Sequence, residues 1–138
     1  MKRTLILVLA ALTVFAAVAV AAPPKKGSYS GKTSQKRAIT FKVSGGKVKA
    51  FSGGVNMICG QSGLQFDAVI PPKAMKLKDG RFSYKGRDKV DGNNIEISGR
   101  VNGGKASGKL RMTDSRYDAG NQSFDVCVGS STWKTKVR

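Results

Sequence analysis

Two cysteines offer the most definite covalent chemistry in this chain. Cys59 and Cys127 form an even pair, and the chain has no histidine and no short Cys-x-x-Cys spacing. A zinc centre of the usual kind draws on such ligands, so a metal pair is the weaker alternative and two buried free thiols are another. We predict a disulfide between Cys59 and Cys127 and no metal ligands. A disulfide that closes a loop of this length reduces the entropy of the unfolded chain, which stabilises the fold by about 4 kcal/mol.

The acidic residues do not form an obvious catalytic pair. Without histidine there is no Ser-His or Cys-His couple, and paired-carboxylate chemistry needs two acids that face each other. Only Asp67 and Glu96 lie in the middle of expected strands. Turn-like contexts account for five other acids: Asp79, Asp88, Asp91, Asp114 and Asp118. We therefore predict a protein that is not an enzyme and that uses no cofactor.

One segment resembles a phosphate-binding loop only in part. Gly103 to Lys109 fits the pattern Gly-x-x-x-x-Gly-Lys, but Leu110 follows where a Ser or Thr would hold magnesium. The flanking residues indicate a strand, a turn and a second strand, whereas the nucleotide loop opens a helix. We do not expect nucleotide binding here.

Basic residues outnumber acidic ones throughout the chain. It has 25 Lys and Arg against 8 Asp and Glu, a net charge of +17; without Lys2 and Arg3 there are 23 against 8, about +15. A charge of this size attracts polyanions over long range. Lysine is a hydrated point charge, whereas arginine is a planar fork. The lysine excess is therefore typical of a cationic surface more than of a sharply defined anion pocket.

Expected strands place part of this charge on one face. In the segment 105–112, Ala106, Gly108, Leu110 and Met112 would point inward, and in the last strand Trp133, Thr135 and Val137 would do so. The residues between them then point outward. From these we select five candidate anion-binding residues: Lys105, Lys109, Arg111, Lys134 and Lys136. Scattered solvated lysines that discourage edge-to-edge aggregation are the simpler alternative.

Two-residue alternation, not a helical stripe, recurs from Tyr29 onward. Short strands are expected at 39–43, 47–51, 64–68, 75–77, 81–84, 95–101, 105–112, 123–128 and 132–137. Gly-Gly and Asp79-Gly80 turns join several of them. This pattern predicts an all-β, single-domain protein of about eight short strands, either an antiparallel β-sandwich or a small β-barrel.

The N-terminus predicts export. Lys2-Arg3 precedes an apolar run from Leu5 to Val20, and Ala21-Ala22 supply the small residues of a cleavage site. We expect residues 1–22 to be a signal peptide, 23–28 a Pro/Lys linker, and 29–138 a secreted or cell-envelope domain with no stable membrane insertion. An uncleaved membrane anchor is the alternative.

Aromatic residues are expected mainly in the core, namely Phe51, Phe66, Phe82, Phe124 and Trp133, whereas the tyrosines Tyr29, Tyr84 and Tyr117 are expected at the surface. The leading hypothesis is association with anionic polysaccharide, wall polymer or extracellular nucleic acid. One alternative is a lipocalin-like or avidin-like barrel that encloses a small apolar ligand. Another is a protein-binding or inhibitor module that uses glycine-rich loops at Gly53-Gly54 or Gly60 to Gly63.

Four short motifs carry a resemblance. They are 27–33 (GSYSGKT), 39–43 (ITFKV), 79–82 (DGRF) and the closing Cys127 with Trp133-Lys134. With these motifs the chain resembles a loose class of small secreted bacterial β-rich proteins. The resemblance implies an all-β fold outside the cytoplasm and supplies no catalytic residue, ligand or partner.

Overall fold

Nine strands make up the part of the chain that the structure describes. The computed structural model describes residues 21–120 and 122–138, and within them no helix has the length and hydropathy needed to cross a membrane. The strands are β1 (Gly27–Thr33), β2 (Ala38–Ser44), β3 (Lys47–Cys59), β4 (Gly63–Val69), β5 (Met75–Lys76), β6 (Arg81–Arg87), β7 (Asn94–Asn102), β8 (Lys105–Asp118) and β9 (Ser123–Val137).

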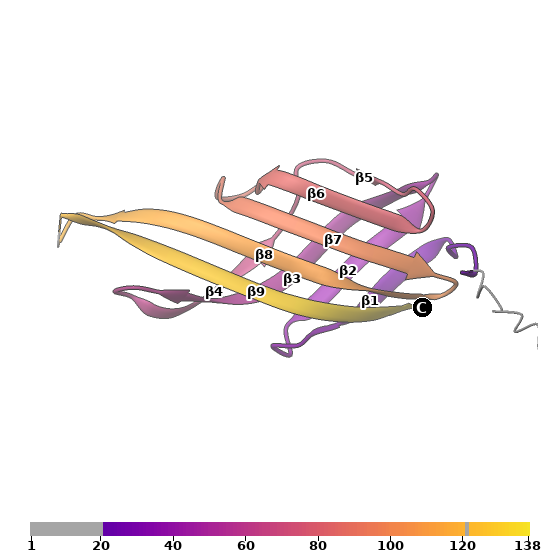
Figure 1. Cartoon of the computed structure of the whole chain (residues 1–138), viewed down its shortest axis with the longest axis horizontal. Coiled ribbons are helices and arrows are strands. Elements are labelled where there is room, and N and C mark those ends of the chain that lie inside the picture. Colours follow the sequence, from indigo (N-terminus) through magenta and orange to yellow (C-terminus); the bar gives the residue numbers. More distant parts are fainter. Residues whose placement is uncertain (1–20, 121) are drawn as a thin grey trace, which may run out of the picture.

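All nine strands belong to one antiparallel sheet. Its order is β4-β3-β2-β1-β9-β8-β7-β6, and β5 pairs with β3 outside this path. Figure 1 shows β6 to β9 crossing in front of β1 to β4, so that the sheet curls into two facing layers. The long hairpin of β8 and β9 projects beyond the layers at the left of the view. The all-β, single-domain architecture predicted from the alternation is therefore confirmed.

The two edges of the curled sheet, at β4 with β3 and at β6, are linked by a few contacts at both ends of the strands. At one end β5 links β6 to β3, since Lys47 pairs with Lys76 and a bridge joins Lys78 to Arg81 across the predicted hairpin turn. At the other end the Asp88 carboxylate accepts a hydrogen bond from the Ile70 N–H at 2.8 Å. Both contacts reduce the exposed edge that an open sheet would present.

Aromatic rings fill the space between the layers. The rings of Phe41, Phe51, Phe82 and Trp133 lie with all centroids 5.8–6.4 Å apart, a spacing typical of favourable aromatic pairs. The indole of Trp133 lies against Gly99 and Gly108, which face each other on β7 and β8. A Cβ at Gly99 would come within 2.7 Å of the Trp133 ring, so glycine is needed there.

Several predicted strand boundaries are wrong. The strand expected at 47–51 continues to Cys59 as β3. The segments 123–128 and 132–137 are one continuous strand, β9, because Gly129 and Ser130 extend the pairing with β8 instead of turning. The strand expected at 105–112 continues to Asp118, which places Asp114 in a strand and not in a turn. The long strands β8 and β9 form the projecting hairpin.

The predicted facing of several side chains is also wrong. Phe66 and Phe124, expected in the core, are 56% and 69% exposed, whereas Tyr29 is buried. The Tyr29 hydroxyl lies 2.8 Å from the carbonyl oxygen of Lys25, and burial raises the pKa of this tyrosine. Gly53 lies inside β3, where a Cβ would meet the Leu110 side chain, so no loop is found there.

The predicted leader falls almost wholly outside the described residues, since they begin at Ala21. The predicted linker leads directly into the sheet: β1 begins at Gly27, and the Lys25 N–H donates to the Gly103 carbonyl at 2.9 Å.

Candidate anion-binding surface

The five basic residues selected from the sequence lie together on the outer face of two neighbouring strands. Lys105, Lys109 and Arg111 belong to β8, Lys134 and Lys136 belong to β9, and all five are exposed. Their partners at alternate positions, such as Leu110 and Trp133, fill the interior. Burial of these apolar side chains therefore orients the charged ones outward.

The strand register brings like charges close. Lys105 lies directly opposite Lys136, and Lys134 lies opposite Ser107 on one side and Lys32 on the other. Side chains at directly opposed positions have Cβ atoms about 5 Å apart, and like charges there repel. A bound anion would relieve this repulsion.

Two further basic residues, outside the five predicted from the sequence, extend this surface. Lys32 comes from β1, and Arg100, which pairs with Ser107, comes from β7. Both are exposed. We call the seven residues together the basic face: Lys32, Arg100, Lys105, Lys109, Arg111, Lys134 and Lys136.

A shallow hollow lies over part of the basic face. Its volume is about 780 Å³, and its lining includes Arg100, Lys105, Lys134 and Lys136, with Ser107 between them. Four cations and a hydroxyl donor around one hollow suit an anionic group that approaches from solvent. Ala21, which precedes the predicted cleavage position, also lines the hollow.

Acidic side chains are scarce around the basic face. On the described outward positions of β7, β8 and β9, Glu96 is the only acid. Its carboxylate lies 2.9 Å from the Lys85 Nζ, and this hydrogen bond lowers the pKa of Glu96. Glu96 pairs with Lys85 of β6 and also lies directly opposite Arg111 at one border of the basic face, and it does not meet Asp67, which lies on β4.

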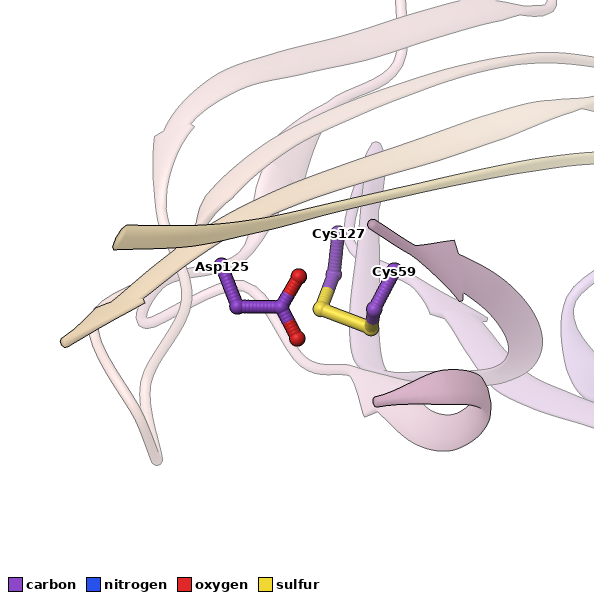
Figure 2. Close-up of side chains that lie close together, drawn as sticks. All are labelled: Cys59, Asp125 and Cys127. Atoms are coloured by element: carbon purple, nitrogen blue, oxygen red, sulfur yellow. A yellow bond between two sulfur atoms is a disulfide. The ribbon is translucent and has the colours of Figure 1, made fainter. Parts of the chain in front are cut away.

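The two cysteines form a disulfide, as predicted. Cys59 of β3 lies directly opposite Cys127 of β9, and the bond is buried. Figure 2 shows the Asp125 carboxylate directed toward the two sulfur atoms. A carboxylate oxygen and both sulfur atoms lie within 4.8 Å of one another, but sulfurs in a disulfide are not thiolate ligands for a metal.

Asp125 has a structural role beside this disulfide. Its carboxylate accepts hydrogen bonds from the Ser62 hydroxyl at 2.6 Å and from the backbone N–H groups of Gln61 and Ser62 at 2.9 and 3.0 Å. The Ser62 hydroxyl contributes most to a lowered pKa of Asp125. The charged carboxylate thus holds the β3–β4 turn against β9.

The partial phosphate-loop motif is a hairpin turn. Gly103 has φ 55° at the turn between β7 and β8, and Lys109 lies six residues further along β8, on the outer face. No helix follows the glycines, so the segment cannot cradle a phosphate as a nucleotide loop does.

Comparison with known proteins finds no match: no family model, no curated protein and no solved structure is similar to the chain. The fold and the surface define this protein as a basic, disulfide-linked antiparallel β domain. The resemblance to small secreted bacterial β-rich proteins stays a prediction.

Proposed function

We propose that this protein is a non-enzymatic, extracytoplasmic domain that associates with anionic polymers through the basic face. The observation that carries the proposal is the row of like charges at Lys105, Lys136, Lys134 and Lys32, on an outer face of β8, β9 and β1 that carries no acid at its described positions. Polymers that present repeated phosphate, sulfate or carboxylate groups suit such a row. Acidic polysaccharide, wall polymer and released nucleic acid all belong to this chemical class.

Location outside the cytoplasm is part of the proposal. The disulfide is compatible with an oxidising compartment, and the basic n-region and apolar run of residues 1–22 support export. Anionic polymers of the envelope would then be the ligands within reach.

The interior gives no argument for the apolar-ligand alternative. Phe41, Phe51, Phe82 and Trp133 occupy the space that a carrier would leave for its ligand. A domain of this size with a filled interior presents its surface, and not a cavity, to partners.

Binding to several purified polymers across a salt series tests the proposal. If the five selected basic residues each release a counterion, affinity should fall by about two to three orders of magnitude between 50 and 200 mM salt. Charge reversal to Glu at Lys105, Lys109, Arg111, Lys134 and Lys136 should weaken binding by at least about tenfold.

A matched control separates the basic face from net charge. Reversal of five exposed lysines elsewhere changes net charge by the same amount: Lys26, Lys47, Lys49, Lys73 and Lys89. The control should retain most of the binding at moderate salt. Equal losses in the two variants would show that only total charge matters and would refute the assignment to the basic face. A polymer that stays bound at a salt concentration where the others dissociate identifies the ligand among the three kinds.

A further inference from the structure

An apolar surface lies on the outer side of two hairpins, the one of β3 and β4 and the one of β8 and β9. Ile58, Leu64 and Phe124 are 74%, 70% and 69% exposed, far more than apolar side chains of a core. Four more exposed apolar residues lie on β4, β8 and β9. We call the set the apolar face: Ile58, Leu64, Phe66, Tyr117, Phe124, Val126 and Val128.

The strand register makes the apolar face continuous. Leu64 lies opposite Ile58, and Ile58 lies opposite Val128, so the face crosses β4, β3 and β9 in one row. Along β9 it continues through Val126 to Phe124, whose ring lies 5.4 Å from that of Tyr117 on β8. Clustered exposed apolar side chains of this kind mark interaction surfaces.

The interior cannot take up these side chains. Cys59, Cys127 and Asp125 occupy the inward positions of the same strands and are buried. Because successive residues of a strand point to opposite faces, the apolar residues between them must point outward. The disulfide therefore fixes the exposure of the apolar face.

The apolar face and the basic face share one side of β8 and β9. Outward positions along β9 run from Phe124, Val126 and Val128 through hydroxyl residues to Lys134 and Lys136. Along β8 they run in the same direction from Tyr117 through Ser115 and Thr113 to the basic residues Arg111, Lys109 and Lys105. No acidic residue occurs at these positions.

A cation also lies on the apolar face itself. The guanidinium carbon of Arg37 is 4.3 Å from the centre of the Phe66 ring, and its Nε donates to the Asn56 side-chain oxygen at 2.8 Å. Positive charge therefore lies at two sides of the apolar face, at Arg37 and at Arg111.

We propose that this combined outer surface docks on a lipid bilayer that bears anionic headgroups. Apolar side chains, with aromatic rings among them, enter the headgroup boundary, and the lysines and arginines beside them contact the charged headgroups. Each basic residue near an anionic surface increases partitioning about fivefold. The domain docks on the surface and does not cross it.

Charge complementarity favours this occupant over a second copy of the chain. Two copies packed through the apolar face would remove Arg37 of each copy from water, and the described outward positions of β8 and β9 offer no acid to pair with it, which opposes association. An anionic bilayer satisfies the apolar and the charged parts at once. A soluble polyanion satisfies only the charged part, so the docking goes beyond the polymer binding proposed above.

Vesicle cosedimentation tests the docking. The oxidised protein should bind vesicles of equal parts phosphatidylglycerol and phosphatidylcholine and should bind pure phosphatidylcholine vesicles at least about tenfold more weakly. A triple variant, Ile58→Thr, Phe124→Thr and Val126→Thr, should lose about tenfold or more in affinity for the anionic vesicles, because three inserting side chains become polar. Threonine keeps the preference for strands.

The control is Val90→Thr, since Val90 is 66% exposed in the connection between β6 and β7 and is not part of the apolar face. It should bind the anionic vesicles like the wild type. An unchanged melting temperature in the triple variant keeps a folding defect out of the comparison.

Three results would overturn the docking proposal. They are equal vesicle binding by the triple variant and the wild type, equal binding of both kinds of vesicle, or sedimentation of the wild type as a dimer that the triple variant abolishes. The last result would identify a second copy as the occupant. Soluble-polymer binding by the triple variant should match the wild type, so failure of the polymer proposal and failure of docking are distinguishable.

Discussion

Asp125 shows how one buried carboxylate positions a turn and a disulfide. It accepts three hydrogen bonds from Gln61 and Ser62, at the end of β3 where Cys59 meets Cys127. Hydrogen bonds to the charged form stabilise it. The turn thus depends on the charge of Asp125 as well as on its shape.

We expect Asp125→Asn to lower the melting temperature at neutral pH, since the amide presents N–H groups to donors. The gap between variant and wild type should narrow as pH falls below about 4, the ordinary pKa of aspartate. The pKa of Asp125 is lower in the folded protein than in the unfolded chain, so the unfolded chain binds the proton first as the pH falls. The stability that the charged carboxylate contributes is therefore lost as the pH falls through the folded-state pKa. Thermal unfolding of both proteins from neutral pH to about pH 2 checks this.

Ser62→Ala is the matched comparison, because it removes one donor and leaves the carboxylate in place. It should produce a smaller loss with the same pH trend. A gap between Asp125→Asn and the wild type that stays constant to the lowest pH would contradict the role assigned to Asp125.

At the scale of the strands, the disulfide joins β3 to β9 where the pairing between them is short. The register gives only the pairs Ile58–Val128 and Cys59–Cys127. Further along, β3 pairs with β2, and β9 pairs with β1. The covalent bond therefore stabilises a narrow junction between two hairpins.

Replacing both cysteines, Cys59→Ser with Cys127→Ser, should reduce the free energy of unfolding by about 4 kcal/mol, the chain-entropy value for a loop of this length. Urea titration measures the loss. Wild-type protein in reducing buffer is the control and should lose a similar amount. A loss under about 1 kcal/mol in both samples would mean that the unfolded state is not strongly restrained by the bond.

Alternation predicted which residues share a face but not always which face is inside. The basic residues of β8 were oriented correctly because the residues that alternate with them, Leu110 and Met112, are apolar and buried, so only one of the two faces could point inward. In β9, Phe124, Val126 and Val128 have the same alternating pattern as a core strand. Cys127 lies between the two valines, so a buried disulfide forces both valines outward, and the predicted disulfide was the signal for their exposure.

Lys32 was missed for a related reason. β1 alternates serine, glycine and lysine with few apolar residues, so its outward positions could not be inferred from its own sequence. Only pairing with β9 places Lys32 beside Lys134. Strand order, which local alternation does not encode, supplied this part of the basic face.

Over the whole molecule, positive charge is concentrated on the outer surface, and several acids are withdrawn from it. The net charge is +17. Asp88, Asp114 and Asp125 are buried, and Glu96 is paired with Lys85. The exposed lysines thus repel one another with little local compensation.

We expect added salt to stabilise the protein, because it screens this repulsion. The melting temperature should rise as sodium chloride increases from about 10 to about 150 mM, over which the Debye length shortens from about 30 to about 8 Å. Differential scanning calorimetry measures the rise. A variant with glutamine at Lys105, Lys134 and Lys136 should show a smaller rise, and a melting temperature independent of salt in the wild type would contradict the argument.

The position of β9 in the sheet has a consequence for the order of folding. β9 is the last of the nine strands along the chain, yet it pairs with β1, β3 and β8 and joins the two halves of the sheet. The contacts of β9 with β1 and β3 join residues that are far apart in sequence, and such contacts form slowly. Until residues 123–137 have been synthesised, the earlier strands lack the partner that closes the sheet. If the chain is exported as proposed above, this late closure of the sheet would favour an unfolded chain during passage through a translocation channel.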